Sequence, residues 1–272
     1  MPGENLTRAE AIERKSVVTS RSYEVELDLT TGPETFRSRT VARFSATPGA
    51  ATFIDAIAAD VHLVVLNGVA LDPAEVADGA RIALPGLAAD NVLEVVADFR
   101  YSTSGEGLHR FVDPIDDEVY LYSQFEVPDS RRVFAVFEQP DLKATFRFAV
   151  TVPQAWTVVS NQPAAAVEDA PQGPSGDRRA RVWTFSPTPV VSSYITAIIA
   201  GPYVDWHDSL QSSDGRTIPL GVFARKSLAE HVDADYVFDK TRQGFAYYEE
   251  KFGVPYPFEK YDQLFVPEFN AG

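Results

Sequence analysis

The chain contains no cysteine among its 272 residues. This absence excludes disulfide bonds, thiolate zinc sites and a cysteine nucleophile. The chain also lacks an excess of basic residues, because 24 Lys and Arg stand against 39 Asp and Glu, for a net charge of −15. This balance argues against a surface that follows nucleic-acid phosphates or adsorbs to anionic membranes. We therefore expect ligands that are small or cationic, and neither nucleic acid nor membrane as a partner.

Long apolar runs are missing as well. Residues 1–15 alternate acids, bases and alanines, and they contain no apolar core of the kind that a secretory signal needs. No later stretch approaches the roughly 20 apolar residues of a membrane-spanning helix. Together with the absence of cysteine, these features predict a cytoplasmic location.

Histidine is scarce, with four in the chain. His62, His109, His207 and His231 lie far apart, and none stands four residues from another. The pattern H-E-x-x-H, which places two zinc ligands and a glutamate base on one helix, is absent. We expect each histidine to serve in packing or at the surface, and we expect no catalytic or metal-binding residue in this chain.

Strand-like alternation is abundant. Tyr23, Val25, Leu27 and Leu29 alternate with charged residues, which is the period of a strand with one solvated face. Polar turns, an Asn67–Gly68 pair and 19 prolines separate the runs. The pattern predicts a mainly β, antiparallel architecture over residues 1–201. The other strand-like runs are residues 36–44, 61–66, 92–99, 119–127, 144–152, 156–160, 181–185, 194–200, 203–209 and 217–224.

A short helix is expected before the first strand. Thr7 is followed three residues later by Glu10, the spacing of a capping box, at the start of a helix over residues 6–16. Residues 170–179 are rich in Pro, Gly and Ser and predict an exposed hairpin loop.

The pattern becomes helical near the end of the chain. Ser227 and Glu230 have the spacing of a second capping box, ahead of a helix over residues 228–252 that Gly253 ends. A break in this helix near residues 233–235 is an alternative. We expect residues 202–272 to be the incomplete start of a second domain. Because the apolar stripe of this helix lacks a partner, we expect the helix to be exposed, to be frayed, or to dock on a second copy so that the chain self-associates.

A carboxylate and an amide stand two residues apart in the run 119–127. In a continuous strand, Gln124 and Glu126 would share one face with Tyr120 and Tyr122. Such a face offers oxygen acceptors beside aromatic walls for an ammonium group, which has three donors. The pattern alone fits an ordinary solvated strand face better.

Two stretches of the chain resemble the aminopeptidase N type zinc metallopeptidases, most closely the actinobacterial ones. The first runs from Gln124-Phe-Glu126 to residues 134–146. It departs from the family at Glu138-Gln139, where many members have Asp-Glu, and at Val136, where many have cysteine. The second, residues 256–272, is similar to the approach to the family's Gly-Ala-Met-Glu-Asn loop.

The resemblance implies a fold and an activity. The fold is a large saddle-like antiparallel β domain, followed by the truncated start of a thermolysin-like α+β catalytic domain. Family members hydrolyse N-terminal amino acids from peptides with zinc held by H-E-x-x-H and a later glutamate, which here would lie beyond Gly272. We therefore expect a zinc enzyme as the parent protein and an inactive fragment that binds no catalytic zinc.

The resemblance also implies roles for four residues. Glu126 would anchor the free amino terminus of a peptide substrate, and Gln124 would shape the pocket for its first side chain. Ala271 and Gly272 would contribute backbone contacts. Two alternatives remain at this point: a non-catalytic β-sandwich module of the same fold that binds proteins, and a carbohydrate-binding β domain.

Overall fold

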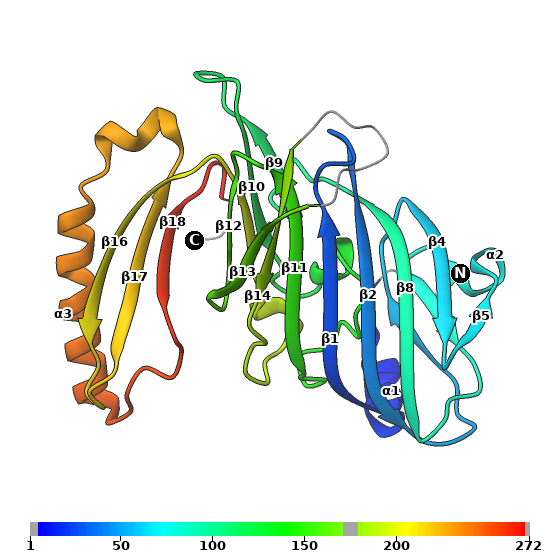
Figure 1. Cartoon of the computed structure of the whole chain (residues 1–272). Helices are drawn as coiled ribbons and strands as arrows, with labels where there is room; N and C mark the ends of the chain where they lie inside the picture. The colour runs from blue at the N-terminus through cyan, green and yellow to red at the C-terminus, as the bar shows by residue number, and fades with distance from the viewer. Residues whose placement is uncertain (1–4, 171–178, 270–272) are drawn as a thin grey trace. The chain divides into compact units, whose positions relative to one another are not determined.

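The computed structural model describes residues 5–170 and 179–269, which form two compact units (Figure 1). Unit 1 comprises residues 1–110, 121–154 and 158–199. Unit 2 comprises residues 111–120, 155–157 and 200–272. The loop predicted at 170–179 lies, apart from its ends, outside the described residues.

An eight-stranded sheet forms the body of unit 1, in the order β13-β14-β11-β1-β2-β8-β4-β5. The predicted antiparallel β architecture is confirmed, since every neighbouring pair is antiparallel except β1 and β11, which pair in parallel. The strands are β1 (Val18–Asp28), β2 (Thr35–Ala46), β4 (Asp60–Leu66), β5 (Val69–Leu71), β8 (Asp90–Arg100), β11 (Thr145–Pro153), β13 (Ala164–Asp169) and β14 (Ala180–Phe185).

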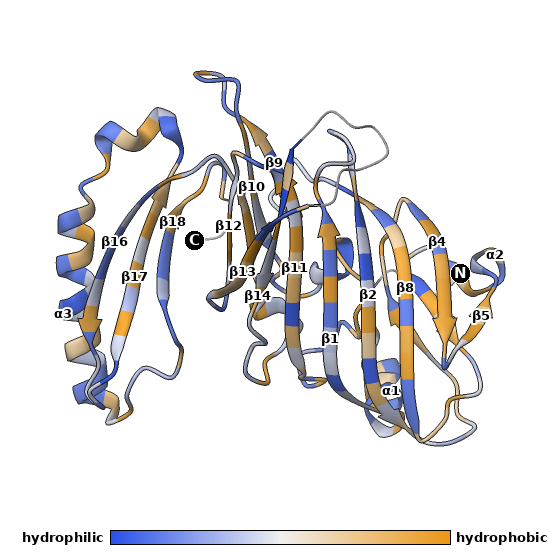
Figure 2. Ribbon diagram, in the orientation of Figure 1, coloured by the Kyte–Doolittle hydropathy of each residue, from blue (hydrophilic) through white to orange (hydrophobic). Residues whose placement is uncertain are grey.

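In this sheet, the apolar residues of the alternating sequence pattern are buried and the charged residues between them are mostly exposed. In β1, Tyr23 and Leu27 are buried, and the residues between the buried positions are mostly exposed. On the solvated face, Arg39 lies 2.8 Å from Glu26 and 2.7 Å from Glu94, so the charged residues pair across the strands. Figure 2 shows the resulting hydrophobic and hydrophilic bands along β2 and β8.

Two smaller sheets and several short helical segments make up the other described elements up to residue 201. One sheet has the order β12-β15-β10-β9 and the other β3-β7-β6. The strand predicted at 194–200 is confirmed only in its second half, where β15 begins at Ile198. The first half of the prediction is wrong, because the 3₁₀ helix η2 (Ser193–Ile195) lies there. The elements are β3 (Thr52–Asp55), α2 (Pro73–Val76), β6 (Ala77–Asp78), β7 (Arg81–Leu84), β9 (Gly107–Val112), β10 (Val119–Gln124), η1 (Ser130–Arg132), β12 (Thr157–Ser160) and β15 (Ile198–Gly201).

Two local predictions in unit 1 are confirmed. Helix α1 (Arg8–Val17) begins with the predicted capping box, in which the Thr7 hydroxyl accepts from Glu10 N and the Glu10 carboxylate accepts from Thr7 N. Asn67 and Gly68 have φ of 54° and 81°, the left-handed conformation that closes a tight hairpin between β4 and β5.

Unit 2 contains a three-stranded sheet and a helix. The sheet has the order β16-β17-β18, with β17 and β18 parallel. Ile218, Leu220 and Val222 of β17 form a core with Ala234 and Phe238 of α3. The elements are β16 (Val204–Gln211), β17 (Thr217–Ala224), η3 (Lys226–His231), α3 (Ala234–Phe252) and β18 (Tyr261–Phe265).

The predicted start of the long helix is wrong. The Ser227 hydroxyl donates to Asp113 Oδ2 at 2.5 Å instead of capping a helix, and residues 226–231 form the 3₁₀ helix η3. Helix α3 starts later, where the Asp233 side chain accepts from Tyr236 N. Its predicted end is confirmed, because Gly253 closes it in the left-handed conformation with φ of 65°.

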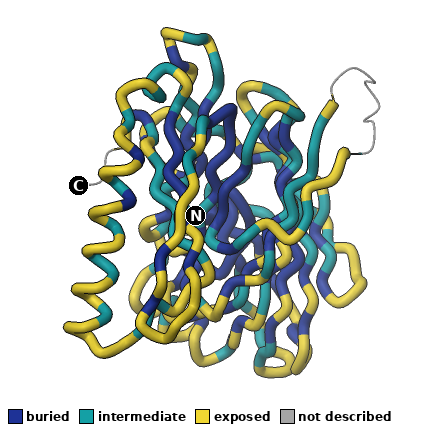
Figure 3. Tube along the Cα trace, turned by 60° about the vertical axis from the view of Figure 1, so that its left-hand side comes forward, coloured by how far each residue is buried: buried dark blue, intermediate teal, exposed yellow. Residues whose placement is uncertain are grey.

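Much of α3 remains uncovered. Figure 3 shows that most of the helix is exposed or half-buried, and its buried residues are Ala234 and Phe238. No helix in the described part of the chain has the length and apolar character needed to cross a membrane.

Candidate substrate-binding site

The two side chains predicted to bind substrate lie where β10 ends, in unit 1. Gln124 is the last residue of the strand and is half-buried, and Glu126 lies exposed in the turn that follows. Within residues 5–170 and 179–269, neither side chain has a hydrogen-bond or ion-pair partner. A ligand could therefore engage both without breaking an internal contact.

The predicted strand geometry around them is wrong. The strand was expected to continue to residue 127, but it ends at Gln124. Tyr120, Leu121 and Tyr122 are all buried, so this inner strand is covered on both faces and does not alternate. The tyrosines belong to the core and do not form aromatic walls beside the exposed Glu126.

The chain is anchored immediately before Glu126. Phe125 is 2% exposed, and its ring packs edge-on against Phe134 with 5.9 Å between the ring centroids. The Ser123 hydroxyl accepts a hydrogen bond from Ile198 N at 2.8 Å, which ties the end of β10 to β15. Glu126 is thus exposed and directly follows Phe125, whose buried ring fixes the chain.

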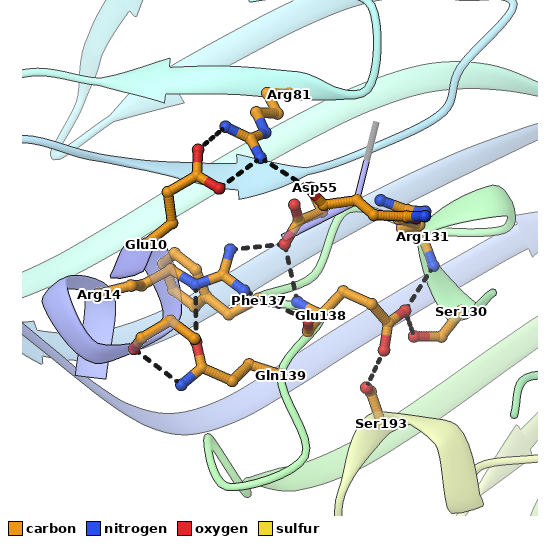
Figure 4. A network of polar contacts seen from close by, with 12 residues as sticks. Glu10, Arg14, Asp55, Arg81, Ser130, Arg131, Phe137, Glu138, Gln139 and Ser193 are labelled. Carbon is orange, nitrogen blue, oxygen red and sulfur yellow. Dashed lines mark hydrogen bonds and ion pairs between the residues drawn. The ribbon is translucent and has the colours of Figure 1, made fainter. Parts of the chain in front are cut away.

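The chain is anchored again just after the turn, by the buried carboxylate of Glu138. This side chain accepts hydrogen bonds from Ser130 Oγ, from Arg131 N at 2.9 Å and from Ser193 Oγ at 2.7 Å (Figure 4). Glu138 is 4% exposed and Ser130 is fully buried. Such buried acceptors are costly to leave without donors, so the contacts fix the groups on both sides.

Arg14 of α1 joins the same cluster. Its guanidinium lies 2.6 Å from Asp55 Oδ2 and donates to Gln139 Oε1 at 3.1 Å and to the carbonyl of Glu138 at 3.3 Å (Figure 4). Asp55 Oδ2 also accepts from Glu138 N at 2.9 Å. The side chains of Arg14 and Asp55 are 1% and 2% exposed, which makes this a buried ion pair.

This cluster was not predicted from the sequence, where Glu138-Gln139 is a departure from the family pattern and neither residue has an expected role. A local signal was present, because two polar residues directly follow the buried apolar run 133–137. Polar groups in such a position need hydrogen-bond partners, although the sequence does not say which.

Burial raises the pKa of Glu138 above its ordinary value of 4.5, although the hydrogen bonds from Ser130, Ser193 and Arg131 oppose the rise. The folded protein therefore binds this proton more tightly than the unfolded chain does. Its contribution to stability must then become less favourable as pH rises from about 4.5 towards the raised pKa. We predict that the free energy of unfolding falls more steeply over this range in the wild type than in Glu138→Gln, which cannot ionise. Urea unfolding at a series of pH values measures both slopes, and equal slopes would contradict the assignment.

The histidines lie in four different elements: His62 in β4, His109 in β9, His207 in β16 and His231 in η3. His109 is 1% exposed and packs against the ring of Tyr122 at 4.9 Å, whereas His62, His207 and His231 lie at or near the surface. Among the residues that the structure describes, no group of three His, Asp or Glu side chains could hold a metal ion.

Chemically, the end of β10 offers the amide of Gln124, and the turn after it offers the carboxylate of Glu126, both without a partner among the described residues. A carboxylate and an amide carbonyl are suitable acceptors for an ammonium group. Ala271 and Gly272, predicted to add backbone contacts, lie outside the described residues, so their role stays a prediction.

The peptidase M1 N-terminal domain matches residues 20–195, a range that runs from β1 to η2 and includes both Glu126 and Glu138. The chain belongs to the peptidase M1 N-terminal domain family. The mainly β fold of unit 1 agrees with this membership, and the resemblance stated from the sequence is confirmed.

Three proteins called aminopeptidase N are similar to this chain over different shares of its length. Aminopeptidase N of Streptomyces lividans is 58% identical over 276 residues, which cover 100% of this chain and 31% of that protein. Aminopeptidase N of Acetobacter pasteurianus is 35% identical over 153 residues, 56% of this chain and 39% of that protein. Aminopeptidase N of Bos taurus is 27% identical over 229 residues, 78% of this chain and 23% of that protein. The chain thus spans about a third of the length of the first relative.

Proposed function

We propose that this chain is the N-terminal part of a zinc-dependent aminopeptidase that removes N-terminal amino acids from peptides. The observation that carries the proposal is the carboxylate of Glu126, which follows Gln124 and has no partner among the described residues, in a chain 58% identical to an aminopeptidase N. Glu126 pairs with the α-ammonium group of the peptide, and Gln124 shapes the pocket for its first side chain. Ala271 and Gly272 add backbone contacts to the same peptide.

This arrangement selects the end of a peptide by its charge. An internal peptide segment has no α-ammonium group, so it would leave the carboxylate of Glu126 without a partner. Rejection of such segments follows from the difference between the two binding free energies. The substrates proposed are therefore peptides with a free amino terminus. The proposed location of the protein is the cytoplasm.

Hydrolysis itself is not assigned to this chain. Its described residues do not fit a zinc site, since no three potential ligands lie together among them, and a catalytic zinc site needs three protein ligands. We place recognition in residues 1–201 and the first part of the catalytic domain in residues 202–272. The zinc ligands belong to the part of the longer protein that follows.

The experiment that tests this function is a peptidase assay with metal analysis on the full-length gene product. Expected are zinc in the purified protein, cleavage of a peptide with a free amino terminus, loss of cleavage with a chelator, and no cleavage of the same peptide after acetylation. The 272-residue chain should show no cleavage in parallel. A zinc-loaded full-length protein that leaves free peptides uncut would overturn the proposal.

One observation favours a second candidate, a module that binds proteins. Helix α3 and the chain from Val254 to Phe265 border an apolar groove of about 820 Å³ in unit 2. Within it Tyr248 is 58% exposed and Phe252 is 73% exposed, a large apolar surface for a water-soluble unit. We propose that a second copy of this chain packs there.

We predict that Phe252→Glu weakens this self-association, because it places a charge in the apolar groove. Sedimentation velocity over a wide range of concentration measures the effect. Ile115→Glu is the matched control, since Ile115 is 79% exposed and does not line the groove. A monomeric wild type at every concentration would rule out the second copy.

A further inference from the structure

The turn that carries Glu126 is short and is held at both ends. Before it, the Phe125 side chain is buried against Phe134. After it, Ser130 is buried and donates to the carboxylate of Glu138. Residues 126–129 must therefore span two fixed points, and a shift of either point moves the carboxylate of Glu126.

We propose that Glu138 is a positioning residue for Glu126: its buried carboxylate fixes the exit of the turn and so aims Glu126 at the amino terminus of the substrate. The inference rests on the proposed function of Glu126. Glu138 contacts no substrate in this scheme and acts through Ser130 and Arg131.

The contacts at the exit of the turn support this role. The same oxygen of Glu138, Oε2, accepts from Ser130 Oγ and from Arg131 N. Two donors from consecutive residues on one buried oxygen define the direction in which the chain leaves the turn. The carbonyl of Arg131 accepts from Ile57 N at 2.7 Å, so the loop after β3 holds this residue as well.

Glu138 is itself held in place. Its backbone N–H donates to Asp55 Oδ2 at 2.9 Å, and its carbonyl accepts from Arg14 at 3.3 Å. A buried ion pair thus supports the backbone of the residue whose side chain supports the turn (Figure 4). The second carboxylate oxygen of Glu138 accepts from Ser193 Oγ, which belongs to η2 and not to the turn.

The two serines offer a matched pair of variants, because both hydroxyls donate to the same carboxylate but only one belongs to the turn. In the full-length protein, Ser130→Ala and Glu138→Ala should raise KM for free-amine peptides about 5- to 10-fold, the loss expected for one or two hydrogen bonds. Ser193→Ala should leave KM within about twofold of the wild type. Glu138→Gln, which can still accept from Ser130 and Arg131, should largely restore the wild-type KM.

Hydrogen exchange on the 272-residue chain tests the same contacts without any activity. Glu138→Ala and Ser130→Ala should speed amide exchange over residues 126–134, whereas Ser193→Ala should speed it near η2 instead. Asn91→Ala is the control for general destabilisation. Asn91 is 3% exposed and makes hydrogen bonds with Ala88 and Asn67, so its loss should leave the turn unchanged.

The outcomes separate the inference from the function on which it rests. If Glu126→Ala raises KM but Ser130→Ala and Glu138→Ala do not, Glu138 has no positioning role and the function stands. If Glu126→Ala leaves KM unchanged, the function assigned to Glu126 fails, whatever the exchange data show. If Glu138→Ala does not fold, the comparison of Ser130→Ala with Ser193→Ala decides, and equal KM values and equal exchange at the turn overturn the inference.

Discussion

Replacing Glu126 with alanine in the full-length protein is expected to lower kcat/KM for peptides with a free amino terminus about 10- to 100-fold, mostly through KM. The reason is the loss of a charge-assisted hydrogen bond, worth about 1.5 to 3 kcal/mol. Because Glu126 is exposed and has no partner in the described chain, the variant should unfold at the wild-type temperature. Steady-state kinetics and a thermal melt measure the two effects.

The control for this variant is Glu75→Ala. Glu75 lies in α2 of the same unit, is exposed and carries the same charge, so its removal changes the net charge equally. It should leave kcat/KM unchanged. Unchanged kinetics in Glu126→Ala would remove Glu126 from the site.

The largest expected effect on stability comes from Arg14→Met. This change leaves Asp55 as a buried carboxylate without its cation and deprives Gln139 and the Glu138 carbonyl of a donor. Breaking one side of a buried ion pair costs about 3 to 5 kcal/mol. We expect the free energy of unfolding, from urea titration of this chain, to fall by an amount in that range.

A second arginine tests whether burial is the cause. Arg21 pairs with Asp90 at 2.6 Å, the same distance as Arg14 and Asp55, but these side chains are 56% and 73% exposed. Arg21→Met should lower the free energy of unfolding by less than about 1 kcal/mol. If the free energy of unfolding falls by similar amounts in the two variants, burial does not add to the contribution of the Arg14–Asp55 pair.

Local features of the fold were predictable because local chemistry determines them. The alternation from Tyr23 to Leu29, the Asn67–Gly68 turn and the Thr7 capping box each follow from residues close together in sequence. The parallel pairing of β1 with β11 was not predicted, because it depends on which distant strands meet.

The start of the long helix shows how a distant contact overrides a local signal. Ser227 and Glu230 have the spacing of a capping box, yet the Ser227 hydroxyl donates to Asp113. Asp113 is fully buried and also pairs with Arg225 at 2.7 Å, so it requires donors. Nothing near Ser227 in the sequence identifies this partner.

The candidate site was predictable only in part. A resemblance indicates Gln124 and Glu126, and neither side chain has a partner in the part of the chain that the structure describes. Their expected strand geometry was wrong, because β10 ends at Gln124 and its tyrosines are buried. The support from Glu138 was missed, since its donors Ser130 and Ser193 come from separate parts of the chain.

The most direct test of the central claim, recognition of a free amino terminus by Glu126, is a double-mutant cycle between protein and substrate. The full-length wild type and Glu126→Gln are each assayed with a peptide that has a free amino terminus and with the analogue in which hydrogen replaces the amino group. If the two groups pair, removing the second should cost little once the first is gone, giving a coupling free energy of about 1 kcal/mol or more. Effects of the two changes that simply add, with no coupling, would contradict the account.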